Sequence, residues 1–107
     1  MNKICITYVP FPTEEAAEEI IKQLLDKHLI ACGNVISSKS SYIWEKTFQK
    51  EDEYIAIMKT SINCTSKVME WIEKNHPYSL PAIIQWEAMA NERYVEWIEA
   101  ETVIHHQ

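Results

Sequence analysis

Glycine is almost absent from this sequence, because its 107 residues include only Gly33. Phosphate-binding P-loops and dinucleotide-binding fingerprints each need several glycines, since the backbone must approach the phosphates closely. Both classes of nucleotide site are therefore excluded.

Basic residues are few and scattered along the chain. There are 16 acidic residues against 10 basic ones, a formal charge of −6, and Arg93 is the single arginine. Because affinity for nucleic acid depends on clustered Lys and Arg, we expect no nucleic-acid partner.

Long apolar runs are also missing. No stretch approaches the roughly 18 residues needed to span a bilayer, and the first 15 residues become acidic before a secretory signal develops. We therefore expect no membrane association and a cytoplasmic location.

Cysteine is present in an odd number, at Cys5, Cys32 and Cys64. The wide spacing matches no zinc-type pairing, and a disulfide scheme would leave one thiol unpaired. We expect mainly buried, reduced thiols that behave as small hydrophobic groups.

What the sequence does contain is globular in composition, with 47% hydrophobic and 24% charged residues. A chain of this length buries one core, so residues 1–107 are predicted to form a single domain. The patterns predict, in order, a strand at 3–9, a helix at 13–28, strands at 31–44 and 47–60, a helix from Ser61 or Asn63 to Pro77, a strand at 81–88, and a helix from Asn91. This order predicts an α+β fold, the ferredoxin-like βαββαβ sandwich, with an extended hairpin and a C-terminal helix.

The hairpin is too long for the rest of this fold. Strands of about 12 residues at about 3.3 Å each reach about 40 Å, whereas a helix of about 16 residues covers only about 24 Å. The overhanging tip carries Tyr42, Trp44 and Phe48, which in water would favour association. We expect another copy of the chain to pair along the overhanging strands.

Catalytic patterns are not evident. The sequence lacks a G-x-S-x-G nucleophile turn, and its many carboxylates fall on faces predicted to be solvated. A cysteine nucleophile with His76 as its base has no supporting local pattern. We therefore expect a protein that is not an enzyme.

Metal ligation has more candidates, namely Cys5, Cys32, Cys64, His28 and His76. His28 and Cys32 are four apart, a ligand spacing only if one helix runs through both. His105 and His106, next to the end of the sequence, are set aside as ligands.

The segment 75–86, "NHPYSLPAIIQW", has two interpretations. In the first it is a hinge, in which His76 caps a helix, Pro77 stops it and Tyr78 fills the corner. In the second, a stiff loop holds the imidazole and the phenol at a sheet edge, where a neighbouring subunit closes a cleft over them. The two interpretations are compatible.

A family resemblance rests on five segments in this order and spacing: "KHLIACGNVI", "SYIWE", "YIAIMKT", "HPYSLP" and "NERYVEWIEAE". Together they resemble the CutA family of divalent-cation-tolerance proteins over nearly the whole chain. The resemblance implies a ferredoxin-like fold related to PII-type signalling proteins, a tight homotrimer built through the long hairpin, and a link to copper and other divalent metals.

The resemblance also implies site residues. Matching family positions are Cys32, Asn34, Tyr42, Trp44, Lys59, His76, Pro77, Tyr78 and Pro81. From these we predict His76 and Cys32 as metal ligands and Tyr42, Trp44, Lys59 and Tyr78 as cleft residues.

The chain departs from the family pattern at several of these segments. Ser79 and Ala82 replace the two glutamates of the family's H-P-Y-E-x-P-E sequence, and Lys46 replaces a hairpin glycine. Val9 and Asn75 stand where copper-binding members have ligands. Because nitrogen and sulfur are then the donors left, we expect any bound metal to be soft or borderline, copper before calcium or magnesium.

Two functions follow from the sequence. The first is a trimeric divalent-metal (copper) tolerance or response protein that acts by binding, without an organic cofactor. The alternative is a PII-like signalling module that binds a small molecule or a partner protein in clefts between subunits.

Overall fold

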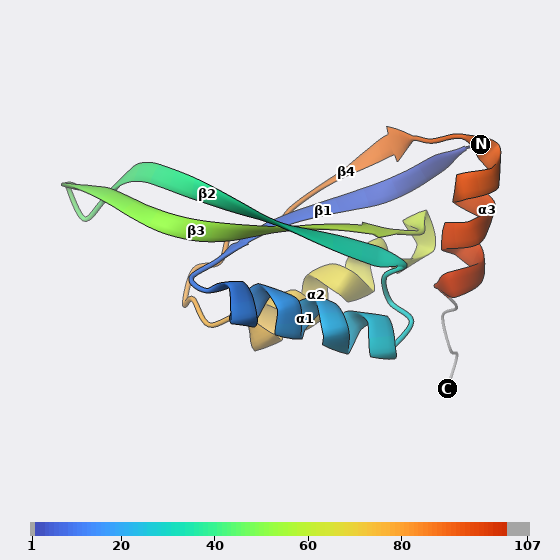
Figure 1. Cartoon of the computed structure of the whole chain (residues 1–107), viewed down its shortest axis with the longest axis horizontal. Coiled ribbons are helices and arrows are strands. Elements are labelled where there is room, and N and C mark those ends of the chain that lie inside the picture. Colours follow the sequence, from blue (N-terminus) through green and yellow to red (C-terminus); the bar gives the residue numbers. More distant parts are fainter. Residues whose placement is uncertain (1, 103–107) are drawn as a thin grey trace.

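The computed structural model of the chain describes residues 2–102 and contains a four-stranded antiparallel sheet flanked by helices (Figure 1). In chain order its elements are β1 (Lys3–Phe11), α1 (Glu14–Asp26), β2 (Cys32–Trp44), β3 (Thr47–Thr60), the short 3-10 helix η1 (Ile62–Cys64), α2 (Thr65–Asn75), β4 (Ile84–Met89) and α3 (Glu92–Glu101). The strand order across the sheet is β2-β3-β1-β4. The predicted α+β, ferredoxin-like βαββαβ order with a C-terminal helix is confirmed.

Helix α1 begins as its sequence predicts. The side chain of Thr13 accepts a hydrogen bond from the backbone N–H of Ala16 at 3.0 Å, which satisfies one of the free donors of the first turn. The helix ends at Asp26, and His28 has a φ of 59°. Because the chain turns there, no helix runs through His28 and Cys32, so their spacing of four places no ligand pair on one helical face.

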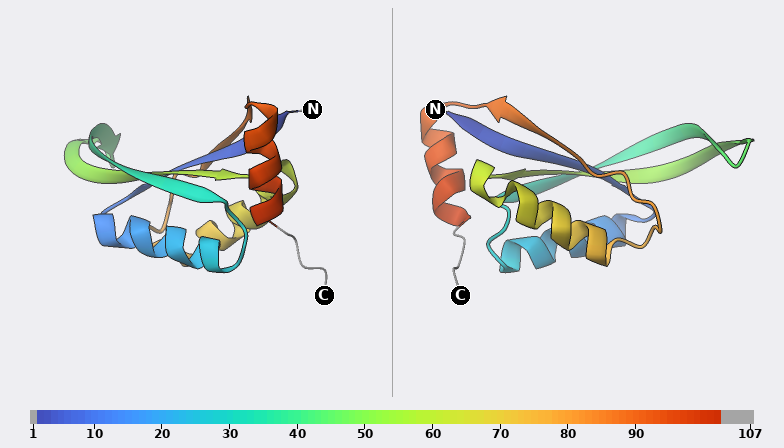
Figure 2. Two further views of the ribbon diagram at one scale, coloured as in Figure 1. Left: turned by 45° about the vertical axis from the view of Figure 1, so that its right-hand side comes forward. Right: turned by 180° about the vertical axis from the view of Figure 1, so that it is seen from behind.

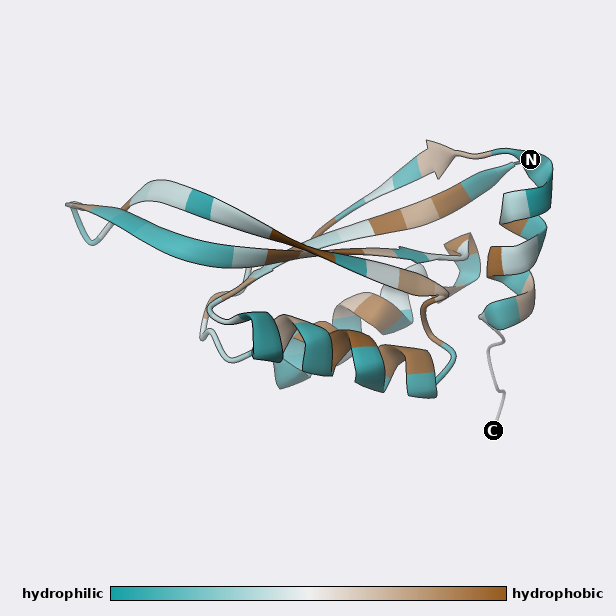
Figure 3. Ribbon diagram, in the orientation of Figure 1, coloured by the Kyte–Doolittle hydropathy of each residue, from teal (hydrophilic) through white to brown (hydrophobic). Residues whose placement is uncertain are grey.

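The main core lies between one face of the sheet and the helices α1 and α2, which lie side by side beneath it (Figures 1 and 2). Alternating bands along α1 in Figure 3 show its apolar side facing the sheet and its charged side facing solvent. The buried members of this core are Val9, Phe11, Ala17, Ile20, Ile21, Leu24, Ile30, Ala56, Met58, Cys64, Val68 and Ile72.

The opposite face of the sheet is only partly covered. Helix α3 packs at the end where β1 begins, and its residues Val95 and Ile98 bury Ile4 (Figure 2). Further along this face, Ile84 and Trp86 of β4 remain about half exposed, at 52% and 47%. An apolar face of this kind marks a surface for association.

The β2–β3 hairpin extends well beyond the helices (Figure 1). Pairing between β1 and β3 stops at Phe11 and Tyr54, whereas β2 and β3 stay paired out to Trp44 and Thr47. The turn residues both have positive φ, as two-residue hairpin turns require. Phe48 near the tip is 63% exposed, so the predicted apolar overhang is confirmed.

Two predicted element boundaries are wrong. Strand β4 begins at Ile84 and not at residue 81, because residues 77–83 form the loop that carries the chain from α2 to the sheet edge. Neither Ser61 nor Asn63 caps α2, because the chain first forms η1 and Thr65 then donates its hydroxyl to the Ile62 carbonyl at 2.8 Å.

Strand β1 is longer than predicted, running through Pro10 to Phe11. Strand β4 pairs with β1 only as far as Tyr8, so β1 is an edge strand where the proline stands. Within residues 2–102, no helix has both the length and the apolar character needed to cross a membrane.

The only glycine is required by a close approach of α1 to β2. A Cβ at position 33 would lie 2.9 Å from Cδ1 and 3.0 Å from Cγ1 of Ile21. We expect Gly33→Ala to lower the free energy of unfolding by about 1 to 3 kcal/mol through overpacking. Urea titration at fixed protein concentration measures it.

The control for this prediction is the Ile21→Val background, which removes Cδ1. There the cost of Gly33→Ala should be smaller, since the two substitutions couple through one contact. An equal cost in both backgrounds would show that Cδ1 of Ile21 does not limit position 33.

Candidate binding site at the base of the hairpin

The predicted site residues fall into separate places. Cys32 and Lys59 are direct partners in the β2–β3 register, near α3. The Cys32 thiol lies 3.4 Å from the Tyr94 hydroxyl of α3, and the Lys59 ammonium donates to Oδ1 of Asn34 at 2.8 Å. Cys32 is partly exposed, so this end of the sheet offers an accessible sulfur donor.

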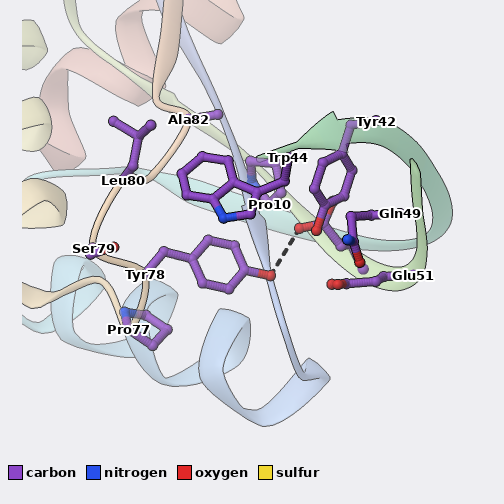
Figure 4. Close-up of a pocket in the computed structure, with 11 residues that line it drawn as sticks. Pro10, Tyr42, Trp44, Gln49, Glu51, Pro77, Tyr78, Ser79, Leu80 and Ala82 are labelled. Carbon is purple, nitrogen blue, oxygen red and sulfur yellow. Dashed lines mark hydrogen bonds between the residues drawn. The ribbon is translucent and has the colours of Figure 1, made fainter. Parts of the chain in front are cut away.

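Tyr42, Trp44 and Tyr78 meet at the other end, where the hairpin leaves the sheet (Figure 4). There they line an open pocket with a volume of about 650 Å³. Its lining comes from the hairpin, from the loop after α2 and from the end of β1: Pro10, Tyr42, Trp44, Gln49, Glu51, Glu53, Pro77, Tyr78, Ser79, Leu80 and Ala82. One chain therefore brings together three of the four predicted cleft residues, while Lys59 lies at the other end of the sheet.

Glu53 is the polar anchor of this pocket. Its side chain is only 9% exposed, and Oε2 accepts a hydrogen bond from the Tyr78 hydroxyl at 2.9 Å (Figure 4). Burial and this bond to Glu53 raise the pKa of Tyr78 well above its ordinary value, so the phenol stays protonated and donates. The pKa of Tyr42 is also raised, by desolvation and by Glu51.

Sequence reasoning missed Glu51 and Glu53, which it assigned to a solvated face. The alternation of side chains along a strand could have placed both residues in the pocket, because alternate residues of β3 share a face. Register pairs Gln49 with Tyr42 and Thr47 with Trp44, so the odd-numbered residues of β3 lie on the face of the two aromatics. Glu51 and Glu53 are the next odd-numbered residues of β3 and lie on the same face.

His76 holds the loop in place. Its Nδ1 accepts from the backbone N–H of Tyr78 at 3.0 Å, so Nε2 carries the proton and donates to the Pro10 carbonyl at 2.8 Å. The ring stacks on Phe11 with centroids 4.4 Å apart. Burial lowers the pKa of His76 below its ordinary 6.5. His76 thus anchors the loop and Tyr78 lines the pocket, whereas closure of the pocket by a neighbouring subunit stays a prediction.

The two predicted metal ligands do not meet within one chain. Cys32 lies level with Ile6 of β1, and His76 lies beside Pro10, four residues further along the strand. At about 3.3 Å per residue this separates them by about 13 Å or more. Among residues 2–102, no three His, Cys, Asp or Glu side chains gather as metal ligands do.

The other metal candidates lie elsewhere. Cys5 and Cys64 are buried, and the Cys64 thiol donates to the Thr102 carbonyl at 3.8 Å. His105 and His106 lie outside the described residues. Ser79 and Ala82, which replace the family glutamates, both line the pocket.

Comparison with known proteins decides the family. The family model described as "CutA1 divalent ion tolerance protein" matches residues 5–101. The chain belongs to the CutA1 family. A divalent-cation tolerance protein CutA of Pyrococcus horikoshii is 39% identical over 98 residues, which cover 91% of this chain and 96% of that protein.

Solved CutA1 structures share the fold over almost the whole chain. CutA1 of Ehrlichia chaffeensis superposes with a TM-score of 0.92 at 34% identity, covering 97% of this chain and 99% of that one. A CutA of Archaeoglobus fulgidus, named as periplasmic, superposes with a TM-score of 0.90 at 29% identity, covering 94% of this chain and 99% of that one.

The lowered pKa of His76 predicts how stability depends on pH. Because the folded state keeps this imidazole neutral, the unfolded state binds more protons below about pH 6.5, and stability falls as pH drops through the folded-state pKa. The slope from one such group is at most about 1.4 kcal/mol per pH unit. Urea unfolding of the parent and of His76→Gln measures this pH dependence. The titration runs from about pH 7.5 to about pH 5, which extends about one unit or more to either side of 6.5.

We expect the free energy of unfolding to fall more steeply with acid in the parent than in the variant. The carboxylates, Glu53 included, are common to both proteins, so the difference isolates the imidazole. Parallel pH profiles would contradict the neutral, hydrogen-bonded state of His76.

Proposed function

We propose that this chain serves tolerance of, or response to, divalent transition metals by binding them, copper foremost, as a cytoplasmic homotrimer and without catalysis. The observation that carries the proposal is the partly exposed Cys32 thiol, a soft donor beside α3 on a CutA1-family sheet. The Cys32 thiol lies 3.4 Å from the Tyr94 hydroxyl of α3, which places this donor at the end of the sheet where α3 packs.

The shape of the sheet supports assembly with copies of itself. Its edges, β2 and β4, are different strands, so a contact between β2 of one copy and β4 of the next is heterologous and closes into a ring when the rotation permits. Such a ring would cover the exposed Phe48 near the end of the hairpin and the exposed Trp86. The number three comes from the family resemblance.

A ring also offers a way to join the two predicted ligands. Because Cys32 and His76 are separated within one chain, a shared site takes the thiol from one copy and the imidazole from the next. Ligation by His76 requires Nε2 to leave the Pro10 carbonyl and lose its proton.

A second function is favoured by the pocket at the base of the hairpin. A hollow of about 650 Å³ with three aromatic rings and few polar groups is of the kind that holds small molecules. This supports the PII-like alternative, in which the chain is a signalling module and the pocket takes a ligand.

The assembly is tested by light scattering after gel filtration. We expect a species of three times 12.6 kDa at micromolar concentration. Trp86→Glu should give a folded monomer, because it puts a charge on the apolar face. The matched control, Leu25→Lys on the exposed side of α1, should leave the trimer intact. A stable parent monomer would rule the trimer out.

Metal binding is tested by calorimetric titration with copper and with zinc, which does not oxidise thiols. We expect Cys32→Ser to weaken binding tenfold or more, and Cys64→Ala, which removes a buried thiol, to change it little. Calcium and magnesium should bind far more weakly. Affinity should fall with pH through the histidine range.

His76→Gln separates two roles for the imidazole. Loss of metal affinity with the trimer retained supports ligation, whereas unchanged affinity with a lower melting temperature makes His76 only the anchor of the loop. Unchanged affinity in Cys32→Ser would sink the proposed metal site.

A further inference from the structure

The pocket at the base of the hairpin has a charge of one sign. Glu51 and Glu53 both line it, and none of its lining residues is Lys, Arg or His. The ion pairs of the described residues lie elsewhere, and the one nearest in sequence joins Lys39 to the neighbouring Asp52 at 2.8 Å. The pocket thus holds two carboxylates without a cationic partner.

Glu53 is the more enclosed of the two carboxylates. The residue is 9% exposed, and its Oε2 accepts a hydrogen bond from Tyr78. A buried carboxylate is stabilised by a positive charge or by several donors. A phenol supplies a donor but no charge, so a cationic ligand would complement the two carboxylates of the pocket.

The walls around these carboxylates are aromatic. The rings of Tyr42, Trp44 and Tyr78 border the hollow, and Tyr42 and Trp44 stay 39% and 49% exposed (Figure 4). The faces of such rings attract cations through their quadrupoles, tryptophan most strongly. Leu80 and the prolines add apolar surface, which suits a ligand with a hydrocarbon body.

The donor set disfavours a metal ion at this place. The pocket offers neither sulfur nor imidazole for a soft metal. Calcium needs about six to eight oxygens, whereas two carboxylates, one amide and the hydroxyls sit here among aromatic and aliphatic walls.

We propose that the pocket binds a small organic cation, an alkylammonium or guanidinium compound with an apolar body, whose charge lies against Glu53 and the Tyr42 and Trp44 rings. This inference rests on the second proposed function and names its ligand class. It is independent of metal binding at Cys32.

The test uses three probes of one shape: 2-phenylethylamine as its ammonium ion, neutral 2-phenylethanol and anionic phenylacetate. The readout is the indole N–H signal of Trp44 in proton–nitrogen NMR spectra of the intact protein, identified by its loss in Trp44→Phe. We expect the ammonium ion to shift this signal with millimolar affinity, as a small fragment does, and the other two to bind at least tenfold more weakly.

Two variants with the same change of net charge locate the effect. Glu53→Gln, which keeps an acceptor for Tyr78, should weaken ammonium binding about tenfold. The matched control Asp52→Asn removes the neighbouring charge of β3, which pairs with Lys39 outside this pocket, and should leave affinity within about twofold. Equal losses in both variants would reduce the effect to bulk charge and overturn the assignment.

Trp44→Leu serves if Glu53→Gln fails to fold. This variant should weaken ammonium binding about two- to fivefold through loss of the cation–π contact. Because the Trp44 signal is then absent, binding is followed by the chemical shift of the Gln49 side-chain amide. Unchanged ammonium affinity in this variant would overturn the role of the Trp44 ring.

The outcomes distinguish failure of the proposed ligand class from failure of the second proposed function, the binding of a small molecule in this pocket. If 2-phenylethanol or phenylacetate binds as tightly as the ammonium ion, the pocket takes small molecules but the cationic class is wrong. If none of the three moves the Trp44 signal, as when a side chain of a partner copy fills the hollow, both the class and the small-molecule function fall.

Discussion

The difference in length between the β2–β3 ladder and the rest of the sheet is the constraint on which this molecule depends. Strand β1 stops at Phe11, yet β2 and β3 remain paired out to the turn at Glu45 and Lys46. An isolated two-stranded ribbon is marginal in water, and this supports the proposed assembly with other copies of the chain. The same extension carries Tyr42 and Trp44 past the end of β1, where they face the loop after α2. The exposed apolar end of the hairpin and the pocket at its base therefore both result from the difference in length between the hairpin and the rest of the sheet.

The loop completes the pocket because a histidine fixes it to the strand that stops. His76 bridges the backbone of Tyr78 and the carbonyl of Pro10, and it stacks on Phe11. A prolyl residue at this edge leaves the β1 carbonyl accessible while β4 has already ended. The neutral imidazole is needed for this arrangement, since one nitrogen must accept while the other donates. The Tyr78 hydroxyl is thereby held against Glu53, so a hydrogen bond joins the loop to the hairpin.

The sequence predicted the fold well because its signals are local or periodic. The apolar stripe of α1, the Thr13 cap and the alternating strands each report on neighbours a few residues away. Boundaries failed where tertiary contacts decide them, as at Ile84, where β4 begins only once it can pair with Tyr8. The candidate site was harder. Tyr42, Trp44 and Tyr78 were named through family resemblance, whereas Glu53 was read as solvated because its burial depends on a loop 25 residues away.

The electrostatics of the pocket are set by β3 and not by the loop. The family resemblance implies glutamates where this chain has Ser79 and Ala82, and both positions line the hollow. With Glu51 and Glu53 already present, two more carboxylates in about 650 Å³ would repel one another unless a multivalent cation bridged them. Replacing them with a small hydroxyl and a methyl group leaves two carboxylates against aromatic and apolar walls. That balance of charge and hydrocarbon suits a ligand of low charge better than a bare metal ion, which separates the pocket from the thiol of Cys32 at the far end of the same face.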